Sequence, residues 1–117
     1  MAIERGKPKL PAAKVLKLAA LADYAEGAVV SRTLVENDAG TVTLFAFDAG
    51  QGLTEHTSPF DALVMVLEGA LTLTIGGTPV HAMPGTIVRM PAGVPHALDA
   101  PEPARMMLLM LRELKEA

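Results

Sequence analysis

The chain has 117 residues, half of them hydrophobic, and ten basic against thirteen acidic side chains, for a net charge of −3. This length suffices for one domain with a core that needs no covalent cross-links. Cysteine is absent, which excludes disulfides, thiolate metal ligands and cysteine nucleophiles. No basic run stands out and aromatics are few, so we expect no nucleic-acid partner.

Residues 12–24 are expected to form a short helix. Val15, Leu18 and Ala22 recur at the spacing of one helical face. Pro11 suits the first turn of such a helix. The pattern predicts a helix that packs on the outside of a larger body.

The same apolar stretch predicts neither a secretion signal nor a membrane span. Lys14 and Lys17 interrupt it, whereas a signal peptide has an unbroken apolar region. No window approaches the roughly eighteen apolar residues of a membrane helix. Together with the absence of cysteine, this leads us to expect a cytoplasmic location and no membrane partner.

From residue 28 onward the sequence is typical of a β-protein. Short apolar or β-branched runs alternate with turns rich in Gly, Pro, Asn and Asp about every eight to twelve residues, which predicts a sandwich or barrel. The expected strands cover residues 28–35, 41–48, 62–69, 71–77, 78–83, 86–91 and 106–113. Residues 1–27 then form an N-terminal extension of the same domain, and 28–117 form a β-barrel.

Side-chain alternation differs among these runs. Leu71 and Leu73 share one face of their strand, and Thr72 and Thr74 share the other. The runs ALVMVL and MMLLML do not alternate, so each fits either a strand buried on both faces or a helix; length and flanking turns favour the strand. The last run could also end in a helical turn near the C-terminus.

Two histidines stand in spaced motifs with glycine and proline. In the first motif, Gly50 is followed by five residues and then His56, and Gly69 closes the motif. In the second, GTIVRMPAGVPH runs from Gly85 to His96. Glycine and proline at such positions are typical of tight corners between strands.

These motifs resemble the two motifs of the cupin family. The resemblance implies an all-β, single-domain cupin jelly-roll β-barrel, also called a double-stranded β-helix, with a short N-terminal helix. Cupins similar to this chain hold a divalent metal with three histidines and one glutamate. Here the matching positions carry His56, Ser58, Ala62 and His96. Because alanine cannot ligate and serine is a poor ligand, the resemblance implies a reduced metal site.

The resemblance places the candidate ligand pocket at the mouth of the barrel. His56, Ser58, His96 and Gln51 are the residues that we expect to line it. A metal is possible on His56 and His96, completed by water, and would be Fe, Ni, Zn, Mn or Cu. Six of the seven methionines are expected to fill the core, with a methionine-lined ligand pocket as the alternative: Met65, Met83, Met90, Met106, Met107 and Met110.

Gln51, Glu55, Asp61 and His81 are weaker candidates for completing a metal site. Asp61 directly precedes the lost glutamate position and Glu55 directly precedes His56, so strand alternation points both away from the site. His81 alternates with its apolar neighbours and is expected to face outward.

Three functions remain open. The first is binding of an unidentified small molecule in the barrel mouth, without conserved metal chemistry. The second is a metal-dependent enzyme of isomerase or dioxygenase type. The third is a dimeric interaction module without a ligand. In each case the resemblance and the exposed edge strands lead us to expect a homodimer.

Overall fold

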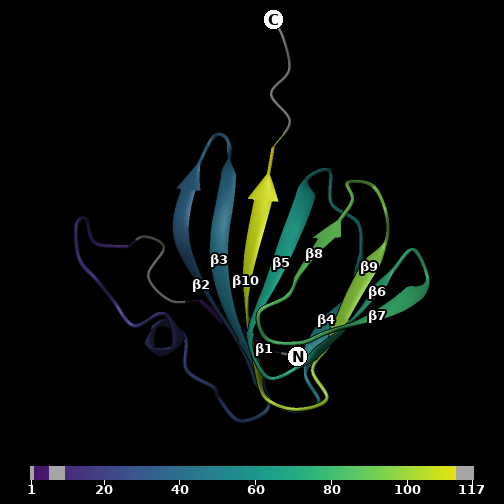
Figure 1. The fold of residues 1–117 in the computed structure, drawn as a ribbon, viewed down its shortest axis with the longest axis horizontal. Coiled ribbons are helices and arrows are strands. Elements are labelled where there is room, and N and C mark those ends of the chain that lie inside the picture. Colours follow the sequence, from purple (N-terminus) through teal and green to yellow (C-terminus); the bar gives the residue numbers. More distant parts are fainter. Residues whose placement is uncertain (1, 6–9, 113–117) are drawn as a thin grey trace, which may run out of the picture.

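The computed structural model describes residues 2–5 and 10–112, which form ten strands and one 3-10 turn (Figure 1). The elements are β1 (Ala2–Arg5), the turn η1 (Leu18–Leu21), β2 (Ala28–Asn37), β3 (Gly40–Phe47), β4 (Gly52–His56), β5 (Asp61–Glu68), β6 (Leu71–Ile75), β7 (Thr78–Ala82), β8 (Ile87–Met90), β9 (His96–Asp99) and β10 (Ala104–Leu111). The helical ending considered for the C-terminal run falls on residues 113–117, outside the described part of the chain.

The strands form two facing sheets. One sheet has the order β1-β2-β3-β10-β5-β8 and the other has the order β4-β9-β6-β7. All pairs are antiparallel except β1 with β2, which is parallel. Strands distant in sequence are therefore neighbours, as in β10 between β3 and β5. This arrangement is an all-β jelly roll, so the predicted fold class is confirmed.

All seven predicted strands are present, including the two runs that do not alternate. In β10, Met106 faces the other sheet and is fully buried, and Met107 on the opposite face is only 9% exposed. Met107 belongs to a second apolar cluster with Leu44 and Ala22 on the outer face of the sheet. Around Met106 and Met107 both faces of β10 are thus covered, which explains why this part of its sequence is continuously apolar.

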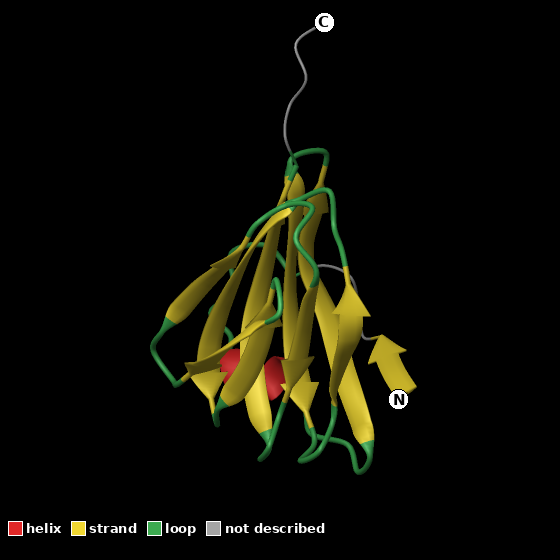
Figure 2. Cartoon of the chain, turned by 90° about the vertical axis from the view of Figure 1, so that its right-hand side faces the viewer, coloured by secondary structure: helices red, strands yellow, loops and turns green. Residues whose placement is uncertain are grey.

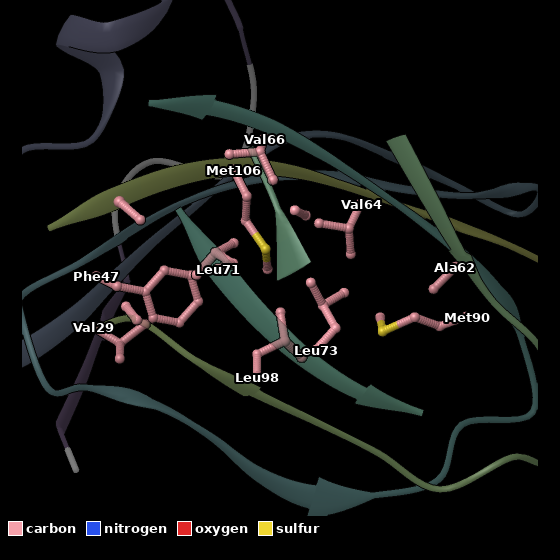
Figure 3. Close-up of a cluster of buried hydrophobic side chains, with 13 residues drawn as sticks. Val29, Phe47, Ala62, Val64, Val66, Leu71, Leu73, Met90, Leu98 and Met106 are labelled. Atoms are coloured by element: carbon pink, nitrogen blue, oxygen red, sulfur yellow. The ribbon is translucent and has the colours of Figure 1, made fainter. Parts of the chain in front are cut away.

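The main core lies between the two sheets (Figure 3). Leu71 and Leu73 are buried there and the threonines between them face outward, as their alternation predicts. Figure 3 shows Phe47 at one end of the core cluster, and Ala62 with Met90 at the other. The small side chain of Ala62 stands at the end where the candidate site lies.

The N-terminal helix is much shorter than expected. Instead of a helix over 12–24, the chain forms only the 3-10 turn Leu18–Leu21, seen in red in Figure 2. Of the predicted apolar stripe, Val15 is fully exposed and Leu18 is 37% exposed, and only Ala22 at its end is buried, so the stripe as a whole does not pack, and a short unsupported helix is only marginally stable. No helix within the described residues is long and apolar enough to cross a membrane.

The end of this extension is held to the outer face of the larger sheet. Arg105 donates from Nε to the carbonyl of Ala22 at 2.9 Å and from Nη1 to Glu68 at 2.7 Å. Its guanidinium lies 4.2 Å from the centre of the Tyr24 ring, and the Tyr24 hydroxyl donates to the same Glu68 carboxylate. The extension is therefore fixed by a partly buried arginine and not by a packed helix.

Candidate ligand site

The two motif histidines lie opposite each other on neighbouring strands. His56 ends β4, His96 begins β9, and the antiparallel register pairs them directly. Side chains paired in this way lie on the same face of a sheet. The Nε2 atoms are 3.1 Å apart and the ring centres 4.4 Å apart. His96 is only 3% exposed, whereas His56 is exposed, so the pair runs from the interior to the surface.

Backbone carbonyls fix the hydrogen position on each ring. His56 donates from Nδ1 to the carbonyl of Thr54 at 2.7 Å, and His96 donates from Nδ1 to the carbonyl of Val94 at 3.1 Å. A carbonyl oxygen can only accept, so each Nδ1 carries a hydrogen, and a neutral imidazole has no second one for Nε2. When both rings are neutral, both Nε2 atoms are therefore acceptors, and they lie 3.1 Å apart.

Burial keeps the inner ring neutral. The pKa of His96 is lowered from its usual 6.5, first because burial disfavours the charged form and also because His56 lies beside it. The hydrogen bond to the Val94 carbonyl acts in the opposite direction but does not reverse the shift. Near neutral pH the site thus presents acceptors, because a charge on the buried ring is unfavourable.

A cavity of about 290 Å³ opens beside the histidine pair. Its polar lining comes from His56, His96, Thr57 and Ser58, all at or near the two motifs. The rest of the lining is mainly apolar and comes from both sheets and the segment between β4 and β5, and includes Leu53, Phe60, Met90, Leu98, Met106 and Met110. The cavity continues the core at the end marked by Ala62 and Met90 in Figure 3.

Ser58 is both a cavity residue and a structural link. It is 8% exposed and its Oγ accepts from the backbone N–H of Phe60 at 3.1 Å. Its carbonyl accepts from the N–H of Gly93 at 2.8 Å, which ties the first motif to the second. The hydrogen of the Ser58 hydroxyl is not needed for either bond and can be donated into the cavity.

The structure brings together three of the four predicted pocket residues. His56, Ser58 and His96 all line the cavity. Gln51 does not: its carbonyl accepts from the N–H of Ala100 at 2.8 Å, in the turn before β4. Glu55 is exposed on β4 and is also outside the lining.

Asp61 and His81 are held elsewhere. The Asp61 carboxylate accepts from the N–H of Ala92 at 2.9 Å and from Arg89 at 3.3 Å, on the face opposite the cavity-lining Ala62. His81 is exposed on β7, the edge strand, with its Nδ1 3.2 Å from the Thr72 hydroxyl. Within the part of the chain that is described, no three His, Cys, Asp or Glu side chains gather as a metal cluster.

The apolar lining was the part of the site that the motifs did not identify. Met90, Met106 and Met110 line the cavity, although methionines were expected mainly as core filler. Met90 and Met110 are the register partners of Ala62 on its two neighbouring strands. A signal was present in the sequence, since small Ala62 stands where a larger side chain would close the space, but it needed the strand register to be interpreted.

Fold and motif together define a small cupin, and comparison with known proteins agrees. Residues 43–112 match the family model described as a cupin domain. No match was found among curated proteins. Because the family model covers more than half of the 117 residues, the chain belongs to the cupin family.

Solved structures give the same assignment. A conserved protein of unknown function from Streptococcus pyogenes is 36% identical, with a TM-score of 0.86, and the match covers 92% of this chain and 94% of that one. A cupin superfamily protein from Desulfitobacterium hafniense is 27% identical over 90% of this chain and 96% of that one, with a TM-score of 0.84. A cupin 2 conserved barrel domain protein from Leptotrichia buccalis is 34% identical, with a TM-score of 0.80, over 83% of this chain and 47% of that one.

Proposed function

We propose that this cupin binds a small, mainly apolar molecule in the cavity between its sheets. His56, Ser58 and His96 are the polar contacts that orient it. The observation that carries the proposal is the pairing of the buried His96 with His56 at one end of an apolar cavity of about 290 Å³ that both residues line. Small-molecule sites typically combine apolar walls with a few convergent polar groups in this way.

The volume limits the size of the ligand. A dry apolar cavity of about 150 Å³ holds benzene, so 290 Å³ corresponds to roughly a dozen non-hydrogen atoms. Nucleotides and nucleotide sugars are too large to be enclosed. The ligand class is therefore a compact molecule, or one compact end of a longer molecule.

Benzene provides a direct test of the cavity, read through the methyl groups of the methionines. On titration, we expect saturable shifts of the Met90, Met106 and Met110 signals. Met83 is 55% exposed and outside the lining, so its signal should stay in place. Unchanged cavity signals at saturating benzene would contradict the proposal.

A cavity-filling variant completes this experiment. Ala62→Leu places a larger side chain in the cavity and should weaken benzene binding about tenfold or more, because the space is taken. Ala39→Leu adds the same atoms to the exposed turn between β2 and β3 and should leave binding unchanged. If Ala62→Leu binds benzene as the wild type does, the ligand is held elsewhere.

A second candidate function is a metal-dependent enzyme, favoured by the geometry of the histidine pair. Two nitrogens about 2.0–2.1 Å from a metal and 3.1 Å apart would subtend roughly 100° at that metal. Both Nδ1 atoms are anchored by carbonyls, as is usual for ligating histidines. A bound metal would supply a Lewis-acid or dioxygen-binding centre of the kind used in isomerases and dioxygenases.

The possible metal-ligating atoms around the histidine pair favour some metals over others among Fe, Ni, Zn, Mn and Cu. Ala62 has no donor atom, and its register partners Met90 and Met110 offer only thioethers. Imidazole with thioether favours copper among these metals, and the absence of a carboxylate in the cavity lining disfavours manganese. Metal analysis of protein purified without chelator should find about one equivalent, lost in His56→Ala and retained in His81→Ala. Metal-free wild-type protein after incubation with each ion would exclude this candidate.

A further inference from the structure

When both rings of the histidine pair are neutral, no hydrogen lies between the facing Nε2 atoms. Each ring uses its hydrogen on a backbone carbonyl, so Nε2 of His56 and Nε2 of His96 are both acceptors. Two acceptors 3.1 Å apart repel each other unless a donor lies between them, and His96, at 3% exposed, has little access to water that could supply that donor. The pair is therefore complementary to a ligand group that supplies a hydrogen at this point.

The charge of that ligand is limited by the lining. No Lys, Arg, Asp or Glu side chain is among the residues that line the cavity. A carboxylate or an ammonium group would be buried there without a counter-charge, which is strongly unfavourable. The hydrogen donor should therefore be an uncharged group.

A hydroxyl group is both a hydrogen donor and uncharged, so it fits the polar end of the cavity. Its hydrogen can be shared by the two Nε2 atoms, and its oxygen can accept from the free hydrogen of the Ser58 hydroxyl. Thr57 offers a second hydroxyl in the same lining. A methyl group of the same size would leave the His96 acceptor unpaired.

The apolar end of the cavity is suited to an aromatic body. Met90, Met106 and Met110 contribute thioethers and Phe60 contributes a ring. Sulfur atoms make favourable contacts with aromatic rings. Flat rings with short substituents also remain within about a dozen non-hydrogen atoms, the limit set by comparison with the benzene-sized cavity.

We propose that the cavity selects neutral hydroxyl compounds with an apolar body, phenols above all, through the paired acceptors of His56 and His96. This inference rests on the proposed small-molecule function and adds to it the chemical class of the ligand. It assigns the imidazoles to recognition of a hydroxyl hydrogen.

Three probes of matched shape test the selection. They are 4-ethylphenol, 4-ethyltoluene, in which a methyl replaces the hydroxyl, and 4-ethylbenzoate, which is charged. Affinity is measured at neutral pH from the shifts of the cavity methionine methyls. We expect 4-ethylphenol to bind about tenfold more tightly than 4-ethyltoluene, because only the phenol satisfies the acceptors, and 4-ethylbenzoate to bind weakest.

The outcomes separate the two proposals. If 4-ethylphenol and 4-ethyltoluene bind equally, the cavity is a ligand site but the hydroxyl selection is wrong. If 4-ethylbenzoate binds most tightly, the imidazoles act as donors and the selection is again overturned. If none of the three binds, the proposed small-molecule function fails as well.

A variant of the exposed histidine isolates its part in the selection. His56→Leu removes one acceptor at an exposed position, where folding should be little affected. The preference for 4-ethylphenol should fall to about threefold or less while 4-ethyltoluene binds as before. His81→Leu, the matched change at the exposed histidine on β7, should keep the full preference. An unchanged preference in folded His56→Leu would overturn the role of the pair.

Discussion

His96 is a histidine that the fold keeps uncharged. It is 3% exposed, its Nδ1 is bonded to a carbonyl, and its pKa lies below 6.5 mainly because of burial. Its exposed partner His56 is solvated at the cavity mouth. At the scale of single residues, this burial makes the folded state sensitive to protonation of the His96 ring.

We expect stability to fall as the pH drops below about 6.5, the usual pKa of histidine. Between that value and the lowered pKa of His96, the unfolded chain binds a proton at this position and the folded chain does not, so protonation favours unfolding. The slope due to one group is at most about 1.4 kcal/mol per pH unit. Urea unfolding at several pH values should show a smaller slope in His96→Gln, and an equal slope would contradict this assignment.

Gly69 is a glycine that the packing requires. Its φ is +71°, and an added Cβ would lie 2.1 Å from the carbonyl oxygen of Pro103. Gly77 also has positive φ, +82°, but an added Cβ there meets open space. Gly77 therefore tests the cost of positive φ alone, and Gly69 tests that cost together with a steric conflict.

Substitution of these glycines by alanine should have unequal effects. Gly77→Ala should lower the free energy of unfolding by about 1–2 kcal/mol, the cost of a left-handed conformation for alanine. Gly69→Ala should lose about 3 kcal/mol or more, because the backbone near Pro103 must also move. Equal losses of unfolding free energy, measured by chemical denaturation, would show that the close approach of Gly69 to Pro103 adds no cost.

Tyr24 reports on the element that precedes the barrel. Burial first, and then its hydrogen bond to Glu68, raise the pKa of its phenol to about 12. Arg105 donates one hydrogen bond to the same Glu68 carboxylate and another to the carbonyl of Ala22. The state of this one ring therefore indicates whether residues 18–27 are docked on the sheet.

Because the chain has a single tyrosine, phenolate absorbance measures Tyr24 alone. We expect a midpoint near 12 in the folded protein and near 10 in denaturant. The stabilisation is present below pH 10 and is lost as the pH rises through 12, since the unfolded chain ionises first. Glu68→Gln should lower the folded midpoint and Glu102→Gln, at an exposed position, should not. A wild-type midpoint of 10 would mean that the segment is undocked.

Elements were predicted from apolar or β-branched runs between turn residues, whether or not the strand is buried. The runs of the mostly exposed β7 and of β10, which is buried around Met106 and Met107, were both found. Strands β4 and β9, which carry the histidines, were missed because they are short and partly polar, and much of their order comes from pairing with each other and with β6. The helix over 12–24 was wrong in extent, because helical periodicity does not ensure a surface to pack on.

At the scale of the molecule, the outer face of β5 and β8 carries exposed apolar side chains beside the Asp61–Arg89 ion pair. An outer patch of Leu63, Leu67 and Ile87 lies on the face opposite the core, with Leu67 37% and Ile87 59% exposed. Exposed apolar patches of this kind mark interaction sites. We propose that a second copy of the chain covers this patch, as expected for a homodimer.

Sedimentation equilibrium tests the dimer. The wild type should have twice the monomer mass at micromolar concentration. Ile87→Glu should raise the Kd of the dimer at least tenfold, because a charge is unfavourable in an apolar interface. Val80→Glu, at a 37% exposed position on the other sheet, should leave the mass unchanged. A monomeric wild type would refute the dimer, and with it the interaction-module function.

The sequence by itself predicted an all-β sandwich or barrel and its corners, and the resemblance of its motifs to the cupin family implied the jelly roll. Alternation is a local property, readable from neighbouring residues such as Leu71 to Leu73, and the glycines mark backbone conformations that other residues avoid. The motif spacing also singled out His56 and His96. Only the tertiary structure decided what those histidines face. Their direct register, the carbonyls that fix their hydrogens, and the methionine-lined cavity beside Ala62 all arise from contacts between strands far apart in sequence, which no local pattern specifies.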